Sequence, residues 1–364
     1  MKFPLFLPCT AVFFAYLTLG EPKAALALDV PSPNGRLVLT FEVKDMDGDR
    51  ACPCYRVACE GRTVLAESRL GLDLDGGPMD RGLAIVNSIR SQRDATWKPV
   101  CGERDSVRDH FHELRVDLRQ TESPHRMLQM TFRAYDEGIA FCYTLPAQDG
   151  LKDFAIVGER TSFRFSGDPT AWAVYAAQGN YDGSEMPLSK VRPGAERPLT
   201  VRIADDLYAA LTEARLVDYA RMKLRPAKGE ACTMEALLDV ERGTPAVTGT
   251  TPFTSPWRVV LVAQSPGRLL EQNDLVLNLN DPCALKDTSW IKPGKVLREV
   301  TLTTAGGKAC VDFCVRRGLQ YVEYDAGWYG HEYDPKADAR AVHLDPKRNP
   351  DPTSLDLHEV IRYA

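Results

Sequence analysis

The sequence lacks a strong charge of either sign, and this absence excludes one class of partner. Lysine and arginine together number 45, aspartate and glutamate number 50, and the formal net charge at pH 7 is -5. A surface that binds nucleic acid or an anionic membrane needs a clear excess of basic residues. We therefore expect no nucleic-acid partner and no electrostatic attachment to a membrane.

Compositional bias is absent as well. Hydrophobic residues make up 44% of the chain and charged residues 26%, both close to the average of soluble globular proteins. These values argue against a disordered chain, a coiled coil and a polytopic membrane protein. The chain has no internal repeat and no low-complexity linker, and its 364 residues predict two or three domains.

The ten cysteines lack the spacing of a metal cluster. Cys52, Cys54 and Cys59 match no zinc pattern, and no histidine lies near them in the sequence. Removal of a signal segment would take Cys9 and leave nine cysteines, an odd number, so a scaffold built entirely on disulfides is excluded for a monomer.

Residues 1–27 have the features of a secretory signal peptide. Lys2 precedes an apolar run over residues 3–19, and the triplet Ala25-Leu26-Ala27 fits cleavage after Ala27. A retained signal anchor is the alternative, because the run approaches the length needed to span a bilayer. In either case we expect the body of the protein to be exported, to the periplasm or the extracellular space, with membrane contact only through this segment.

Between residue 37 and about residue 262 the chain consists of short apolar runs separated by glycine, proline, asparagine and aspartate. Alternation within these runs predicts strands, and residues 45–49 and 136–138 predict turns. The predicted strands lie at residues 37–43, 114–118, 127–134, 139–143 and 258–262. Their density predicts a mainly β fold containing a large antiparallel β-sandwich.

After residue 300 the pattern changes to alternating helix and strand. We predict a helix over residues 304–317, a buried strand over 319–324, and a helix over 355–363 with Ser354 as its N-cap. This order is typical of the first βα units of a (β/α)8 barrel, but a closed barrel takes about 250 residues. The last helical pattern also has no stop signal before Ala364. We therefore expect the barrel to be incomplete and the chain to be a fragment of a longer reading frame.

Asp325 and Trp328 directly follow the predicted strand, at the end where βα barrels carry their functional loops. A carboxylate beside an aromatic ring suits a sugar, because the acid accepts hydroxyl hydrogen bonds and the ring covers the C–H face. The structural alternative, in which Asp325 ties down a turn and Trp328 packs in the core, is equally consistent with the residues. The polar connection over residues 278–295 similarly suits either a functional loop or an interdomain strap.

Four segments in order along the chain resemble signatures of glycoside hydrolase family 97. They are Ser255–Val259, Asp274–Asn280, Asp287–Lys295 and Tyr324–Tyr329. Three earlier segments, at residues 32–37, 55–57 and 68–72, resemble the N-terminal domain of the same family. The resemblance extends from about residue 29 to the end of the chain.

The resemblance implies an exo-acting glycoside hydrolase that cleaves α-glucosides or α-galactosides, with a calcium ion in its active site. It implies a sandwich domain over residues 28–283 and the linker and start of the catalytic barrel over residues 284–364. The two catalytic carboxylates of the family come from later barrel strands, so we expect them beyond Ala364. Some family members invert the anomeric configuration and others retain it, and the sequence leaves this outcome and the preferred sugar open.

The resemblance also assigns site residues. Asp182 falls on the position at which the family's N-terminal domain supplies a calcium ligand, and Glu185 is the substitute if the loop is contracted. Calcium accepts either carboxylate, although an ordinary polar turn is the alternative. Trp290 and Lys292 match a motif that lines or supports the sugar site.

Two other functions remain open. A noncatalytic carbohydrate-binding or surface β-sandwich protein explains the strands and the export signal, but not a barrel-like strand that ends in Asp325 and Trp328. An isomerase that uses the sandwich itself needs paired histidine and glutamate on one sheet face, for which His110 and His112 have strand spacing.

Overall fold

The computed structural model describes residues 27–175, 185–241 and 243–364, and these fall into two compact units. The sandwich unit comprises the described residues of 27–98 and 106–282, and the C-terminal unit comprises residues 99–105 and 283–364. Asp182 and nearly all of the predicted signal segment lie outside the described residues. Among the described residues, no helix is both long and apolar enough to cross a membrane.

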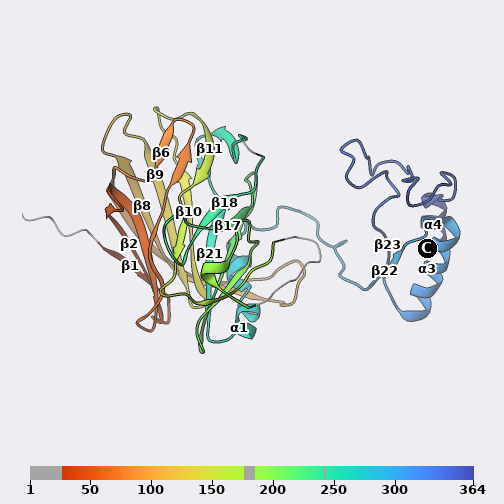
Figure 1. Ribbon diagram of the computed structural model, residues 1–364. Helices are drawn as coiled ribbons and strands as arrows, with labels where there is room; N and C mark the ends of the chain where they lie inside the picture. Colours follow the sequence, from red (N-terminus) through yellow and green to blue (C-terminus); the bar gives the residue numbers. More distant parts are fainter. Residues whose placement is uncertain (1–26, 176–184, 242) are drawn as a thin grey trace, which may run out of the picture. The chain divides into compact units, whose positions relative to one another are not determined.

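A ten-stranded antiparallel sheet is the largest element of the sandwich unit (Figure 1). Along the sheet its strands are β14 (Met186–Pro187), β13 (Thr170–Trp172), β15 (Leu199–Ala204), β16 (Leu207–Ala214), β21 (Trp257–Ala263), β10 (Gly138–Leu145), β9 (Met127–Tyr135), β8 (Val107–Gln120) and β7 (Leu83–Trp97). The tenth strand, β20 (Phe253–Thr254), pairs with β10. A short 3-10 helix, η1 (Leu188–Lys190), follows β14.

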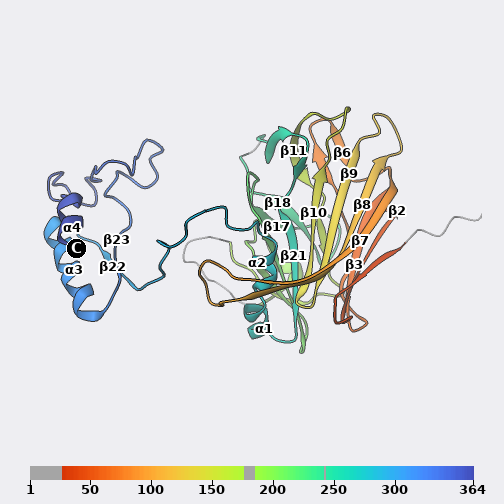
Figure 2. The same ribbon diagram turned by 180° about the vertical axis from the view of Figure 1, so that it is seen from behind.

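Three smaller antiparallel sheets complete the sandwich unit, as the two opposite views in Figures 1 and 2 show. The first contains β1 (Leu28–Pro31), β2 (Leu37–Met46), β3 (Asp49–Cys59) and β4 (Arg62–Arg69). The second contains β19 (Val247–Thr250), β11 (Asp153–Glu159), β5 (Leu72–Leu74) and β6 (Gly77–Met79). The third contains β12 (Ser162–Arg164), β18 (Thr233–Leu238) and β17 (Met222–Pro226).

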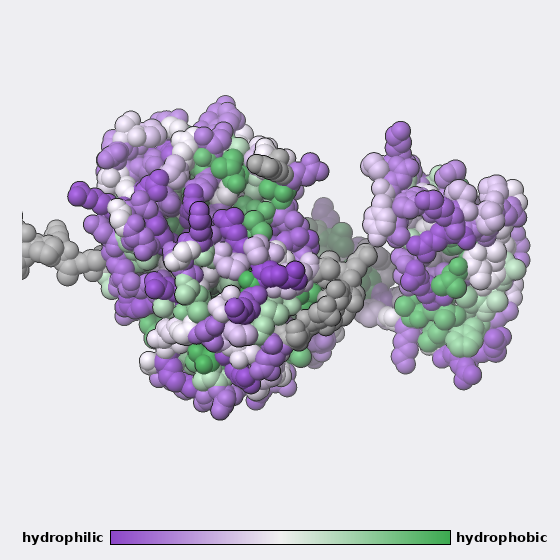
Figure 3. Space-filling model, viewed as in Figure 1, coloured by the Kyte–Doolittle hydropathy of each residue, from purple (hydrophilic) through white to green (hydrophobic). Residues whose placement is uncertain are grey.

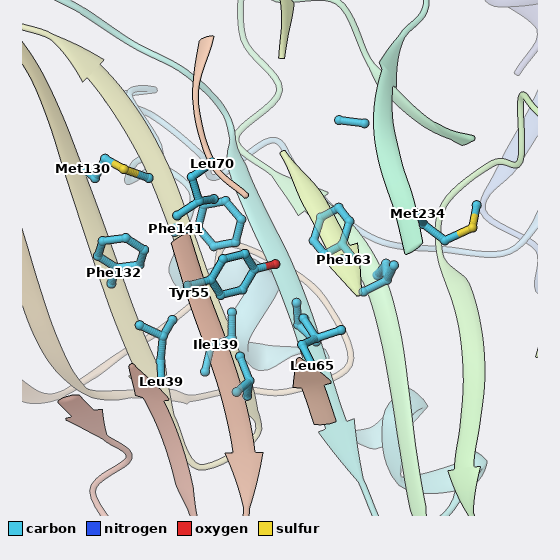
Figure 4. Close-up of a cluster of buried hydrophobic side chains, with 14 of the residues drawn as sticks. Leu39, Tyr55, Leu65, Leu70, Met130, Phe132, Ile139, Phe141, Phe163 and Met234 are labelled. Atoms are coloured by element: carbon cyan, nitrogen blue, oxygen red, sulfur yellow. The ribbon is translucent and has the colours of Figure 1, made fainter. Parts of the chain in front are cut away.

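One face of the ten-stranded sheet packs against the smaller sheets and forms the main core. Aromatic rings dominate its centre: Phe132 of β9, Phe141 of β10 and Tyr55 of β3 are all fully or almost fully buried (Figure 4). The Tyr55 and Phe141 ring centroids lie 5.0 Å apart in a tilted arrangement, which aromatic pairs favour. This contact joins two sheets across the core.

The opposite face of the ten-stranded sheet is covered by two short helices, α1 (Pro266–Glu271) and α2 (Asp274–Asn278). Leu269 of α1 and Leu275 of α2 pack on a second core that includes Trp257 and Leu261 of β21. All seven residues of β21 are buried because the strand is covered on both faces. Gly138 pairs with Leu261, and a Cβ at Gly138 would overlap the Val260 carbonyl oxygen.

The prediction of a mainly β fold with a large antiparallel sandwich is confirmed. Every predicted strand lies within β2, β8, β9, β10 or β21, and both predicted turns close hairpins. The period-2 pattern succeeds because each strand of a sandwich has one face in a core.

The C-terminal unit contains one βαβ segment followed by a loop and a helix. Its elements are β22 (Val296–Glu299), α3 (Thr304–Arg317), β23 (Tyr321–Tyr324) and α4 (Leu357–Tyr363). The two strands are parallel, with Val296 opposite Tyr321 and Glu299 opposite Tyr324. Thr303 caps the start of α3, and Gly318, with φ +68°, ends it in the left-handed conformation that glycine favours. This is the βα arrangement that the sequence predicts.

Two details of the C-terminal prediction are wrong. The N-cap of α4 is Asp356, whose carboxylate accepts the Glu359 amide at 2.9 Å, while Ser354 instead accepts the Thr304 amide through its carbonyl. The strand β23 is also not fully buried: Tyr321 is 43% exposed, and the residues of β23 alternate between exposed and half-buried.

On the face seen in Figure 3, hydrophobic residues gather on part of the C-terminal unit.

Candidate functional site

The carboxyl ends of β22 and β23 lie at the same edge because the strands are parallel and in register. We call this edge, with Arg298, Glu299, Asp325 and Arg348, the mouth of the C-terminal unit. These four residues line one hollow together with Val300, Leu302 and Ala326. The hollow measures about 30 Å³, enough for a water molecule and too small for a sugar ring. A sugar would therefore meet the mouth from its open side.

Asp325 forms an ion pair with Arg298, which lies on the neighbouring strand. Both side chains are about half exposed, at 47% and 49%. A carboxylate held by a guanidinium keeps further lone pairs for hydroxyl donors, and the guanidinium keeps further N–H groups. The pair therefore offers both donors and acceptors at the mouth.

Glu299 has a structural role rather than a free carboxylate. It is 3% exposed, and its two carboxylate oxygens accept the backbone amides of Thr301 and Leu302, each at 2.8 Å. These bonds fix the turn from β22 into α3. A Cβ at Gly306 would overlap the Thr301 hydroxyl and lie against the Glu299 carboxylate, so the tight turn requires glycine at that position of α3.

Trp328 is held rigidly beside the mouth. Its Nε1 donates to the Tyr324 carbonyl at 3.1 Å, and its ring packs on the small core that contains Leu302, Val311 and Val360. The Tyr329 ring meets it edge-on, with centroids 5.2 Å apart. Trp328 thus packs on a core, as the structural alternative to a sugar platform predicts, but it also remains partly exposed.

Tyr324, the last residue of β23, has a buried hydroxyl for which the described residues supply no hydrogen-bond partner. Burial raises the pKa of Tyr324 to about 12, and the nearby Glu299 carboxylate adds to this effect. The hydroxyl lies against α3, where a Cβ at Gly307 would overlap it. Gly306 and Gly307 therefore allow α3 to approach both strands closely.

Lys292 contacts the opposite end of β23 through its backbone carbonyl, and the Trp290 indole bonds within its own loop. The Lys292 carbonyl accepts the Tyr321 hydroxyl, and Tyr321 opens β23, whereas Asp325 follows its last residue. The Trp290 ring is 67% exposed, and its Nε1 donates to the Asp287 carbonyl at 3.1 Å. The structure brings Asp325 and Trp328 to one edge, and neither Trp290 nor Lys292 lines the hollow there. A sugar-binding role for these two residues stays a prediction.

Calcium gains no support from the described residues. Glu185 is 54% exposed and pairs with Arg202 at 2.8 Å, so a metal ion would compete with a guanidinium for its carboxylate. Within the described ranges, no group of three or more histidine, cysteine, aspartate or glutamate side chains is arranged to hold a metal. The described residues thus do not form a calcium site by themselves, and the role of Asp182 stays a prediction.

A buried ionic cluster in the sandwich unit was missed by the sequence reasoning. Arg258 of β21 pairs with Glu159 of β11 and Glu213 of β16, each at 2.6 Å, and none of the three side chains is more than 4% exposed. Burial opposes the charge on Arg258, but the adjacent Glu159, Tyr219 and Glu213 together hold the pKa of Arg258 above its ordinary value. The available signal was a single arginine inside the otherwise apolar strand at residues 257–263.

His110 and His112 do not form a paired site. The Nε2 of His110 lies 4.0 Å from Asp94, while the Nδ1 of His112 is 3.0 Å from the Pro31 carbonyl. Their separate contacts give no support to isomerase chemistry on this sheet.

Comparison with known proteins identifies the family. The family description "Glycosyl-hydrolase 97 N-terminal" matches residues 30–282, more than half of the chain. The chain belongs to glycoside hydrolase family 97. This match confirms the resemblance inferred from the sequence motifs and covers nearly all of the sandwich unit.

Curated relatives of this family 97 chain are glycosidases. It is 26% identical over 389 aligned positions to the retaining α-galactosidase of Bacteroides thetaiotaomicron, covering 94% of this chain and 54% of the relative. It is 28% identical over 314 positions to a probable retaining α-galactosidase of Streptomyces bingchenggensis, covering 80% of this chain and 45% of the relative. The chain thus spans about half the length of these relatives.

Solved structures agree with this assignment. A family 97 enzyme from a Pseudoalteromonas species, determined as a variant in complex with panose, superposes with a TM-score of 0.75 at 27% identity. The alignment covers 83% of this chain and 48% of that enzyme, and the same enzyme has been determined with acarbose. A β-arabinopyranosidase at 21% identity, with a TM-score of 0.63, shares the fold.

Proposed function

We propose that this chain is part of an exported enzyme that hydrolyses terminal α-galactosidic or α-glucosidic bonds. The observation that carries the proposal is the family match over residues 30–282. The names of the relatives add α-galactosides as a substrate class, and the panose and acarbose complexes add α-glucosides. Export rests on the signal-like segment at residues 1–27.

At the mouth, Asp325 would accept hydrogen bonds from sugar hydroxyls while Arg298 holds its carboxylate in place. Trp328 would offer a fixed aromatic edge, since its indole N–H is already bonded to the Tyr324 carbonyl. Both residues bind and orient in this proposal. Neither is assigned the proton transfer or the nucleophilic attack.

Glycoside hydrolysis uses two carboxyl groups, about 5–5.5 Å apart for retention and about 6.5–9.5 Å apart for inversion. The mouth contributes Asp325 as an exposed carboxylate, and its other acid, Glu299, is bound to two backbone amides. The described part of the mouth thus does not contain such a pair. We propose that the acid and its partner lie in the part of the relatives' length that this chain does not span.

Calcium is part of the proposal as a ligand of the complete active site. When bound, it would supply positive charge near the sugar. Asp182, or Glu185 in its place, is the residue of this chain proposed to reach it.

The test is an assay of two proteins with 4-nitrophenyl α-galactoside and 4-nitrophenyl α-glucoside, each with and without a calcium chelator. One protein is the 364-residue chain, and the other continues through the in-frame codons that follow codon 364. We expect nitrophenol release only from the longer protein, with a loss of activity on chelation. An inactive longer protein would overturn the proposed activity, and activity unaffected by the chelator would overturn the calcium proposal alone.

A binding protein without catalysis is the second candidate. It requires only a folded sandwich unit, which has a core and a buried ionic cluster of its own. Sugar binding without nitrophenol release by the longer protein would support it.

A further inference from the structure

The sandwich unit contains a groove remote in sequence from the mouth residues. Residues of β11 and β18, two strands of different sheets that Figure 1 labels, line it. The Ala236 amide donates to the Thr161 carbonyl at 2.9 Å, and beyond this bond residues 157–160 and 235–238 line opposite walls. The groove has a volume of about 430 Å³, within the range of small-molecule sites.

Each wall of the groove carries one arginine–carboxylate pair. On the first wall the Nε of Arg160 lies 2.8 Å from Asp73, and on the second the Nε of Arg225 lies 3.1 Å from Glu235. All four side chains are between 23% and 53% exposed. An arginine has five N–H donors and a carboxylate has about four lone-pair positions, so each pair retains capacity for a ligand.

Apolar side chains lie between these polar pairs. Val157 is 53% exposed and Val240 is 37% exposed, although β-branched apolar residues are usually buried. Both line the groove together with Leu238. The groove therefore combines small apolar surfaces with paired donors and acceptors on two sides.

The charges of the groove decide between ligand classes. Arg160 and Arg225 are each matched by a carboxylate, and the exposed Glu241 adds one further carboxylate to the described lining. An anion is therefore disfavoured, and the described residues contain no group of three or more histidine, cysteine, aspartate or glutamate side chains placed to hold a metal cation. A neutral ligand with many hydroxyl groups fits better, because every hydroxyl both donates and accepts and the C–H faces of a sugar ring contact apolar side chains. We propose that this groove binds one or two sugar residues of a neutral oligosaccharide.

This proposal goes beyond the proposed catalytic function and does not depend on it. It places a second sugar site on the sandwich unit, where it would hold an oligosaccharide without cleaving it. The mouth residues Asp325 and Trp328 take no part in this site.

The test is isothermal titration of the 364-residue chain with panose and with melibiose, an α-glucoside and an α-galactoside. The variants are Arg160→Ala and Arg225→Ala, with Arg160→Lys and Arg225→Lys as milder changes that keep the charge but lose the planar fork. Arg108→Ala is the matched control. Arg108 of β8 pairs with Asp94 of β7 at 2.8 Å and does not line the groove. Asp325→Asn separates this groove from the mouth.

We expect the parent chain to bind at least one of the two sugars, each groove variant to Ala to bind at least tenfold more weakly, and the Lys variants to fall between. Arg108→Ala should bind as the parent does. The proposal is overturned if the parent binds neither sugar when the sugar is in the millimolar range and in about 20-fold molar excess over the protein. It is also overturned if folded Lys variants bind as tightly as the parent. Loss of binding in Asp325→Asn alone would place the sugar at the mouth and would also overturn it.

Discussion

Arg258 and Glu159 form an ion pair inside the sandwich unit, with Nη2 and Oε1 2.6 Å apart and neither side chain exposed to solvent. Glu213 accepts a second guanidinium N–H at 2.6 Å, and the Tyr219 hydroxyl donates to Glu159 at 2.9 Å. These contacts connect β11, β16 and β21, which lie in two different sheets. The cluster therefore links the large sheet to a smaller one through buried ion pairs and hydrogen bonds.

Replacing Glu159 with glutamine should destabilise the sandwich unit by about 3–5 kcal/mol, because Arg258 would keep a buried charge with one partner removed. Urea unfolding followed by circular dichroism measures this loss. Arg108→Ala, which breaks an exposed pair, should cost about 0–1 kcal/mol. Equal unfolding midpoints for Glu159→Gln and the parent chain would contradict a stabilising role for the cluster.

Replacing Gly307 with alanine should destabilise the C-terminal unit by about 1–3 kcal/mol, because the new methyl group would overlap the Tyr324 hydroxyl. Thermal unfolding monitored by near-ultraviolet circular dichroism measures the change. The second substitution Tyr324→Phe removes the overlapping oxygen and should restore part of the loss. Gly267→Ala in α1, where a Cβ meets open space, is the control and should not destabilise the chain. A Gly307→Ala variant as stable as that control would refute the close approach.

The described cysteines should differ sharply in reactivity. Burial raises the pKa of Cys142 to about 12 and of Cys54 to about 12, which keeps both as unreactive thiols at pH 8. Cys101 and Cys283 are exposed. Labelling of the native chain with iodoacetamide, followed by peptide mass spectrometry, should modify the exposed pair first. Modification of Cys142 at the same rate would show that the core is open.

The same shift has a consequence for stability against pH. The folded state raises the pKa of Cys142 from 9.0 to about 12, so the folded state favours the neutral thiol. Its contribution to the free energy of unfolding is therefore complete below about pH 9 and is lost as the pH rises toward 12. Cys142→Ala should show a smaller loss of stability over that interval than the parent chain.

The sandwich could be predicted because its strands carry a local signal. Residues 127–134 alternate between core and surface, and the Asp136-Glu137-Gly138 turn marks the reversal into β10. The N-cap of α4 could not be chosen from sequence, since Ser354 and Asp356 are both good caps. The Ser354 hydroxyl instead donates to the Leu302 carbonyl at 3.1 Å, a contact 52 residues away in sequence.

The position of a candidate site residue could be predicted only where the order of helix and strand along the chain fixes it. Asp325 follows a parallel strand, so its place at the mouth could be inferred from the helix–strand order alone. Glu299 ends the neighbouring strand, but its bonds to the Thr301 and Leu302 amides depend on the path of the turn, which no periodicity encodes. The resemblance assigns Trp290 and Lys292 to the sugar site, but neither lines the hollow at the mouth. The Lys292 carbonyl contacts the first residue of β23, and the Trp290 indole contacts Asp287.

The role of Asp325 in sugar binding is tested most directly by kcat/KM for 4-nitrophenyl α-galactoside and α-glucoside, measured on the protein that continues beyond codon 364. Asp325→Asn is compared with Asp338→Asn, because Asp338 also pairs with an arginine, Arg340, in the same unit but does not line the mouth. The account predicts that Asp325→Asn lowers kcat/KM at least tenfold, about 1.4 kcal/mol of lost binding, while Asp338→Asn stays within twofold of the parent. Equal kcat/KM for both variants and the parent would contradict it.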